Sequence, residues 1–143
     1  MKTITPDQLA DTLVAEYMRY VKDISEIAEV VADEIAAEAK NMAETIGGYK
    51  DNSKALRRAK TKAGEKPYRK SFSVRKSRSS SGLIVSVTLV NSKYQLTHLL
   101  EYGHALKGGG RARAFPHWGP TESKYVKVYE QRLKTRIERE GRR

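Results

Sequence analysis

The chain has 143 residues and no cysteine, and its 28 Lys and Arg outnumber its 17 Asp and Glu, giving a formal net charge of +11. This length makes a single domain spanning residues 1–143 the default, with roughly two-thirds of the unfolded surface buried on folding. The lack of cysteine excludes disulfides, cysteine-bound zinc and a cysteine nucleophile. No window approaches eighteen consecutive apolar residues, and the first seven residues contain no apolar run typical of a secretory signal. We therefore expect a soluble protein made inside the cell.

Charge is distributed unevenly along the chain. Residues 1–45 carry 4 basic and 10 acidic side chains, residues 46–82 carry 12 and 2, and residues 83–143 carry 12 and 5, so the three net charges are −6, +10 and +7. A basic excess favours a polyanionic partner, because Lys and Arg displace counterions from phosphates. The acidic first third weakens that inference, since the two signs can neutralise each other between subunits or within one chain. We rank assembly above nucleic-acid binding.

The amino-terminal segment, residues 1–48, is predicted to be a long amphipathic helix. Thr5-Pro6-Asp7-Gln8 supplies an N-cap, a proline at the first helical position, an acid near the positive end of the dipole and the closing residue of a capping box. Gly47-Gly48 supplies a stop. Apolar residues recur between them at steps of three or four: Leu9, Leu13, Tyr17, Tyr20, Ile24, Ile27, Val31, Ile35, Ala39, Met42 and Ile46.

The length of this helix poses a question of its own. About 40 helical residues would span ~60 Å, whereas a compact sphere of this chain length has a diameter of roughly 37 Å. Either the helix kinks or breaks, for which Asp23 and Glu26 offer a second N-cap and N3 pair, or another molecule covers the apolar stripe that extends beyond the domain. The sequence leaves both alternatives open.

Residues 49–78 are predicted to form a basic flexible arm or loop, because they are rich in Lys, Arg and Ser. Tyr49, Tyr68 and Phe72 flank its charges, and such a combination can hold single-stranded nucleic acid by charge and stacking. No recognition-helix, RRM or KH signature accompanies it. We identify eight residues as candidate contacts to a polyanion or to a neighbouring subunit: Lys54, Arg57, Arg58, Lys60, Lys62, Lys66, Arg69 and Lys70.

A β-hairpin is predicted next. Phe72 and Val74 alternate with polar residues, as in a short half-buried strand, and Ser77 to Gly82 resembles a turn. Leu83 to Val90 follows as a stronger strand. Because side chains alternate along a strand, one face should carry four aliphatic residues: Leu83, Val85, Val87 and Leu89.

The remaining elements are a short helix, a loop and a final helix. Leu spacing within Tyr94 to Tyr102 fits a two-turn helix that ends at Gly103, and residues 104–113 read as a flexible basic loop. Gly119-Pro120 introduces a carboxy-terminal helix with a basic last turn. The predicted fold class is α+β: a long amino-terminal helix, kinked or straight, a small antiparallel β-sheet with a short helix, and a carboxy-terminal helix, with residues 79–143 holding the hairpin, the glycine-rich loop and that last helix.

Catalytic chemistry is not indicated. His98, His104 and His117 lie near Glu101 in the sequence, but their spacing matches no recognised zinc pattern, and ordinary packing and capping roles are favoured over metal or acid–base chemistry. Gly108-Gly109-Gly110 fits neither a Walker pattern nor a GxGxxG motif. We expect no catalytic residue, no cofactor and no metal.

The region from Tyr94 to about Glu122 carries a family resemblance. Its elements are Tyr94 to His104 (YQLTHLLEYGH), then Gly108-Gly109-Gly110-Arg111, Phe115-Pro116-His117 and Gly119-Pro120-Thr121-Glu122. In this order they resemble tail-component proteins of tailed bacteriophages, also called tail-completion or neck proteins of siphophages. The order of elements is similar over nearly the whole chain, and the specific motif is confined to this region.

The resemblance implies a structural virion protein without catalytic activity. It would be a tail-completion or head–tail joining subunit in a homo-oligomeric ring, hexameric by that resemblance, at the head-proximal end of the tail. Its partners would be other neck and tail proteins, namely the tail terminator, tail tube and head-closure protein, with packaged DNA close by and no membrane. It would be made in the bacterial host cytoplasm and reside in the virion, in the tail or neck. The alternative is a basic nucleic-acid-binding protein that uses residues 50–78.

The motif residues are assigned to a turn or an interface. Leu100, Tyr102, Phe115 and Trp118 are expected to pack into the core, Gly103 to end the short helix, and Arg111 and Arg113 to face a partner. The full set is Leu100, Glu101, Tyr102, Gly103, His104, Gly108, Gly109, Gly110, Arg111, Arg113, Phe115, Pro116, His117 and Trp118.

Overall fold

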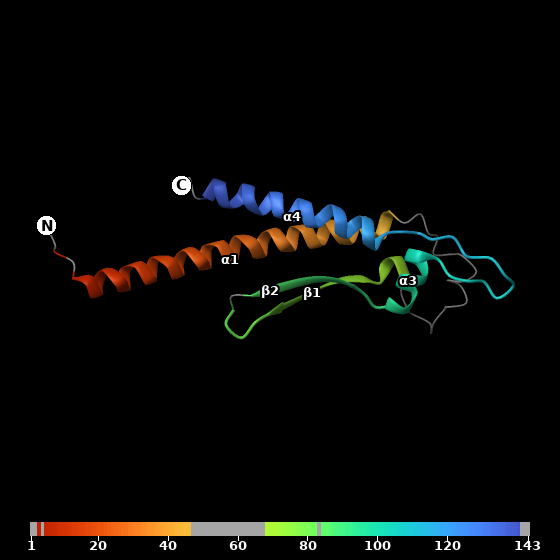
Figure 1. Ribbon diagram of the computed structural model, residues 1–143, viewed down its shortest axis with the longest axis horizontal. Coiled ribbons are helices and arrows are strands. Elements are labelled where there is room, and N and C mark those ends of the chain that lie inside the picture. Colours follow the sequence, from red (N-terminus) through yellow and green to blue (C-terminus); the bar gives the residue numbers. More distant parts are fainter. Residues whose placement is uncertain (1–2, 4, 47–67, 83, 141–143) are drawn as a thin grey trace.

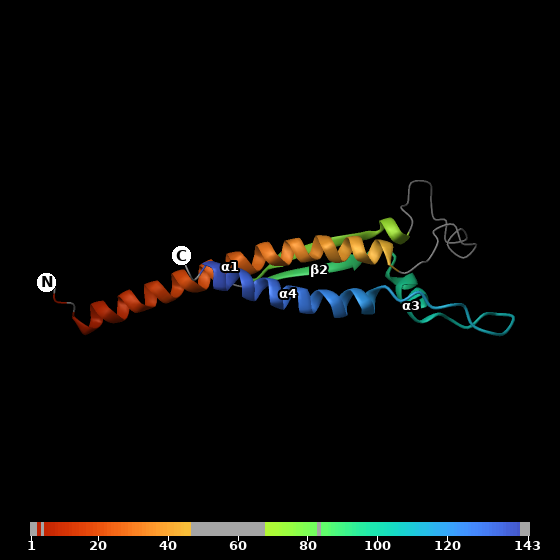
Figure 2. The ribbon, with the colours of Figure 1, turned by 90° about the horizontal axis from the view of Figure 1, so that it is seen from above.

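A computed structural model describes residues 3, 5–46, 68–82 and 84–140 and shows the predicted α+β architecture. The molecule is elongated, with α4 and a β-hairpin lying along different sides of one long helix (Figures 1 and 2). The elements in chain order are α1 (Pro6–Thr45), the 3₁₀ turn η1 (Tyr68–Lys70), β1 (Phe72–Arg78), β2 (Val85–Asn91), α3 (Tyr94–Tyr102) and α4 (Trp118–Glu140).

Helix α1 is continuous for 40 residues. The predicted capping box is confirmed: the Gln8 amide donates to the Thr5 hydroxyl, and the Gln8 side chain accepts from the Thr5 amide. The possible second start at Asp23 is not used, so the helix does not break. Ile46 is the C-cap, and the Gly47-Gly48 stop lies outside the described residues.

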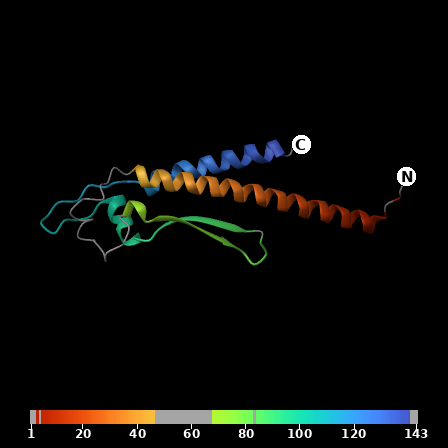
Figure 3. The same cartoon turned by 180° about the vertical axis from the view of Figure 1, so that it is seen from behind.

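The two halves of α1 have different surroundings. Val31, Ile35 and Ala39 are buried where α1 packs against α4 and the hairpin. Residues 6–20, which we call the α1 arm, are exposed throughout. Seen from behind, α1 continues past the ends of both α4 and the hairpin (Figure 3). The overhang expected from helix length is therefore present.

The sheet has two antiparallel strands, with Phe72 opposite Asn91 and Arg78 opposite Val85. Val85, Val87 and Leu89 are half-buried while the alternating residues Ser86 and Thr88 are exposed, which confirms the predicted alternation for the described part of the strand. The strand starts two residues later than predicted, and Leu83 lies outside the described residues.

The predicted boundary of the basic arm at residue 78 is wrong. Tyr68 begins the ordered η1 turn, and residues 72–78 form β1. Tyr68 and Phe72 are buried in the core, where their rings pack edge-to-face with centroids 5.5 Å apart. They therefore do not offer the exposed stacking faces expected at the edge of an arm. Residues 49–67, with six of the eight basic candidates, lie outside the described residues.

The core lies at the carboxyl end of α1. Ala43, Tyr68 and Phe72 form its centre, and five partly buried side chains pack against them: Leu89, Leu96, Leu100, Phe115 and Trp118. The prediction that Leu100, Phe115 and Trp118 pack inward is confirmed. It is wrong for Tyr102, which is 74% exposed. The reason is helical phase, because Glu101 occupies the buried side of the last turn of α3 and the next residue points about 100° away.

Ion pairs hold the acidic side of α1 against its two basic neighbours. Glu29 and Asp33 pair with Lys76 and Arg78 of β1, and Glu34 and Glu38 pair with Arg132 and Arg136 of α4. Hydrogen bonds from Lys76 and Arg78 hold the pKa of Glu29 below its ordinary value. Part of the charge asymmetry in the sequence is thus neutralised within one chain.

None of the helices in the described part of the chain combines the length and the apolar character that a membrane-spanning helix needs.

Candidate functional site

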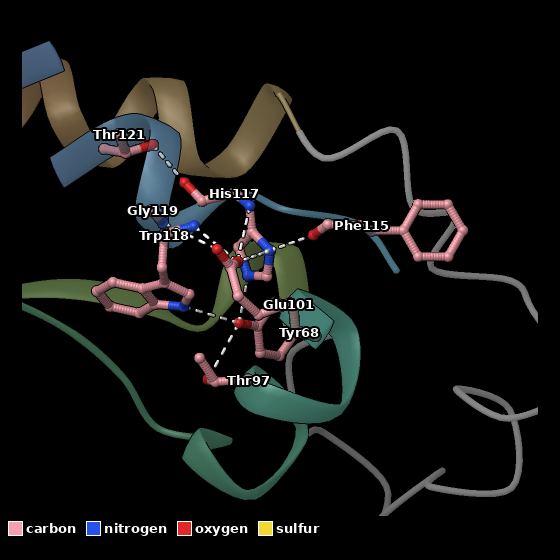
Figure 4. Close-up of polar contacts among 8 residues, drawn as sticks. All are labelled: Tyr68, Thr97, Glu101, Phe115, His117, Trp118, Gly119 and Thr121. Carbon is pink, nitrogen blue, oxygen red and sulfur yellow. Dashed lines mark hydrogen bonds and ion pairs between the residues drawn. The ribbon is translucent and has the colours of Figure 1, made fainter. Parts of the chain in front are cut away.

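The resemblance motif folds into a buried polar network where α3, the following loop and α4 meet (Figure 4). The Glu101 carboxylate accepts backbone hydrogen bonds from His117 at 2.8 Å, Trp118 at 2.9 Å and Gly119 at 2.9 Å. Amides at the start of a helix have no intrahelical partner. Glu101, supplied by α3, therefore caps the amino terminus of α4.

The capped carboxylate is stable as a negative charge. Burial raises the pKa of Glu101, but the three backbone donors and the nearby His117 outweigh burial and leave the pKa below its ordinary value. The positive end of the α4 dipole acts in the same direction. The carboxylate thus joins two helices by charge-assisted hydrogen bonds.

His117 connects this cap to the core. Its side chain is fully buried, with Nδ1 2.7 Å from the carbonyl oxygen of Phe115 and Nε2 2.7 Å from the hydroxyl of Tyr68. The Tyr68 hydroxyl also contacts Thr97 at 3.1 Å and accepts from the Trp118 indole at 3.2 Å. Burial raises the pKa of Tyr68. The network therefore links η1, α3 and α4 through one tyrosine hydroxyl.

This arrangement is suited to holding segments together. A carboxylate, an imidazole and a phenol in contact are the groups of an acid–base site, but a catalytic group must reach a proton of its substrate. His117 has no exposed surface, and both oxygens of Glu101 accept backbone hydrogen bonds. Within the described ranges, no three His, Asp or Glu side chains are placed to hold a metal ion.

The three histidines are not brought together around Glu101. Only His117 pairs with that carboxylate in the described part of the chain, at 3.1 Å. His98 is exposed on α3, and His104 is half-buried with an Nδ1 atom that has no hydrogen-bond partner.

The loop between α3 and α4 forms a small hairpin. Gly103 caps α3 with φ 70°, and a Cβ there would collide with the backbone oxygen of Ala112, so the prediction that glycine ends this helix is confirmed. Ala105 and Arg111 form an antiparallel bridge. Gly109 and Gly110 have positive φ in the turn between them. The predicted loop is thus an ordered projection at the end of the molecule opposite the amino terminus (Figure 1).

The loop places its cations at the surface. Arg111 and Arg113 are exposed, and the Arg113 guanidinium lies 5.5 Å from the centre of the Phe115 ring. Neither arginine forms an ion pair with another described residue, and their expected contact with a partner stays a prediction. Of the basic arm candidates, the structure describes only Arg69 and Lys70, which belong to η1.

Sequence reasoning missed the capping role of Glu101 and the central position of Tyr68. The sequence does contain a signal for the capping role of Glu101. The residue before α4 is His117, not the Ser, Thr, Asp or Asn that usually caps a helix, so the free amides at this helix start need an acceptor from elsewhere. Helix α4 begins at Trp118, one residue before the start predicted at Gly119-Pro120.

Apolar side chains are exposed at both ends of the molecule. On the α1 arm, Leu9, Leu13, Tyr17 and Tyr20 are 49%, 60%, 65% and 59% exposed. At the other end, Tyr94, Leu99 and Tyr102 are exposed on one side of α3, and Leu106 is exposed in the loop that follows. We call these last four residues the α3 face. Exposed apolar side chains gathered on one element typically mark an interaction site.

Comparisons of the chain with protein-family models, with curated proteins and with solved structures found no match.

Proposed function

We propose that this protein is a structural subunit of a tailed-bacteriophage virion. In this role it completes the tail or joins it to the head, as one member of a homo-oligomeric ring at the head-proximal end. The observation that carries the proposal is the α1 arm, whose apolar stripe is exposed to solvent. The motif resemblance provides the virion context, including neighbouring tail-terminator, tail-tube and head-closure proteins.

The arm supports an assembly role on physical grounds. Its fifteen residues extend for roughly 22 Å and repeat the apolar spacing that is buried farther along α1. An isolated helix of this length is marginal in water, and most helical stability in proteins comes from packing of the apolar face. A second protein surface that covers the stripe would supply that packing.

The polar network at the opposite end supports the same role. Its ionisable groups are buried and committed to backbone amides or to one another, so they fix the positions of α3, the loop and α4. Such a junction gives a rigid subunit that presents a loop at one end and a helix at the other. Rigid projecting elements are useful for binding neighbours in an assembly.

The alternative is nucleic-acid binding by residues 50–78. Lys76 and Arg78 in that segment are paired with Glu29 and Asp33, and the two aromatic residues at its end are buried. These contacts reduce the charge and stacking surface available to a nucleic acid. We therefore favour assembly, and binding to single-stranded DNA measured across salt concentrations tests the alternative, with a steep decline in affinity expected only if several phosphates are contacted.

Localisation in particles tests the proposed function. Antibody raised against the chain should label purified phage particles at the junction of head and tail. Particles assembled without the chain should accumulate as separate heads and tails, and supplying the wild-type chain should restore joining. Normal infectious particles that lack the chain would overturn the proposal.

A further inference from the structure

The first observation behind a further inference is the chemistry of the α1 arm. The arm carries three carboxylates, Asp7, Asp11 and Glu16, against one cation, Arg19, so its net charge is negative. Asp7 and Asp11 lie on the side of the helix turned away from the apolar stripe, and they form no ion pair with any described residue. By contrast, Glu16 pairs with Arg19 of the same helix at 3.3 Å. The surface that covers the arm should therefore be apolar where it meets the stripe and should carry net positive charge overall.

The second observation is that the α3 face meets this description. Tyr94 and Tyr102 are 70% and 74% exposed, and Leu99 of α3 and Leu106 of the following loop are 37% and 47% exposed at the same end of the molecule. The loop that follows α3 carries exposed cations that form no ion pair with other described residues: Lys107, Arg111 and Arg113. Exposed apolar side chains and net positive charge at this end of the molecule complement the apolar stripe and net negative charge of the arm.

The third observation is the position of the two surfaces. The arm and the α3 face lie at opposite ends of an elongated molecule (Figures 1 and 2), so the arm cannot fold back onto the α3 face of its own chain while α1 is straight. Pairing of two arms side by side would instead bring together two helices of the same net negative charge. Both facts favour contact between unlike ends of two copies.

We infer that the α1 arm of one copy docks on the α3 face of the next copy. The contact is heterologous, because the two partners use different surfaces. Repetition of a heterologous contact produces a closed ring when the rotation closes and a filament when it does not. The inference rests on the proposed function only in requiring that copies of this chain assemble, and it names the surfaces by which they do so.

Cross-linking tests the contact directly, because the wild-type chain has no cysteine to interfere. Ala10→Cys places a thiol at the edge of the apolar stripe of the arm, and Gln95→Cys places one on the exposed side of α3, without removing a large apolar side chain. A short bismaleimide should join the two variants when they are mixed. It should join neither variant to itself. Lys127→Cys, on the exposed surface of α4, is the matched control that should not cross-link to Ala10→Cys.

Mixing of defective copies tests the heterologous geometry. Leu13→Gln with Tyr17→Gln disables the arm, and Tyr94→Gln with Tyr102→Gln disables the α3 face. These side chains are exposed in the single chain, so each double variant should fold, which circular dichroism can verify. By light scattering, each should be monomeric alone, while their equimolar mixture should form a heterodimer and nothing larger. Val126→Gln, at an exposed position of α4 outside both surfaces, should assemble like the wild type.

The outcomes separate this inference from the proposed function. Self-cross-linking of Ala10→Cys would show pairing between arms and overturn the inference, as would full assembly of either glutamine variant. A wild-type chain that stays monomeric and uncross-linked at high concentration would also overturn it. A chain that makes the head-to-tail contact but is absent from phage particles would overturn the proposed function and leave the contact standing.

Discussion

The two halves of α1 share one apolar period but have opposite environments. Val31 and Ile35 are buried against α4 and the hairpin, whereas Leu13 and Tyr17, on the same stripe, are exposed. The carboxyl half is also fixed by ion pairs to β1 and α4, and we call it, together with the elements packed on it, the anchored half. The period of a helix therefore shows which face will be covered, and it does not show whether the cover comes from the same chain.

Removal of the Glu101 carboxylate should have the largest effect on the anchored half. Glu101→Ala leaves three amides at the start of α4, one buried and two partly buried, without their acceptor, which should lower the free energy of unfolding by roughly 3–5 kcal/mol. Urea denaturation followed by circular dichroism measures this loss. Glu122→Ala, which removes an exposed acid of α4 beyond its first turn, is the control and should change stability by less than about 0.5 kcal/mol. Equal losses in the two variants would contradict the capping role.

Truncation of the apolar stripe should distinguish the two halves directly. Val31→Ala removes fully buried methyl groups and should lower the free energy of unfolding by about 1–2 kcal/mol. The burial of these groups no longer stabilises the fold, and the cavity that they leave adds a further cost. Leu13→Ala removes more atoms but from an exposed side chain, so under dilute conditions it should change stability by less than about 0.5 kcal/mol. Similar losses at both positions would mean that the arm is covered within a single chain.

Local signals were sufficient to predict the order and type of the α-helices and β-strands. The capping box at Thr5 and the glycine after Tyr102 depend on neighbours within four residues, and the sequence shows both. The cap of α4 depends on Glu101, sixteen residues before His117, and no periodic pattern connects them. The sequence therefore predicts which segment contains the candidate site. The hydrogen bonds within the site can be identified only from the tertiary structure.

The continuity of α1 and the burial of Tyr68 could not be predicted for the same reason. Asp23 and Glu26 were compatible with a second helix start, and only packing of α4 and β1 along the following residues favours an uninterrupted helix. Tyr68 lies among basic residues that locally resemble a solvated arm, yet its ring is taken into the core by Phe72 and His117. Contacts distant in sequence decide both cases.

Acidic pH should weaken the anchored half through Glu101. Its pKa is lowered in the folded state, so its contribution to stability is complete above the ordinary value of 4.5 and is lost as the pH falls through the lower folded value. Glu101→Gln cannot titrate at this position. The difference in unfolding midpoint between wild type and Glu101→Gln should therefore shrink as the pH is lowered from about 6 to about 3. A difference that stays constant over this range would contradict the lowered pKa.

The smallest effect is expected from the ion pairs that mark where the anchored half begins. Lys76 lies 2.6 Å from Glu29 and 2.8 Å from Asp33, but all three side chains are partly exposed, and such pairs contribute little to stability. Lys76→Ala should lower the thermal midpoint slightly at low salt, and the loss should disappear at high salt because the charges are screened. Lys22→Ala removes a partner only of Glu26 at 3.9 Å, beside the arm, and should change the midpoint less at either salt concentration. A salt-independent loss in Lys76→Ala would instead indicate that its aliphatic stem packs against α1, and the boundary between the two halves would then depend on apolar contact more than on charge.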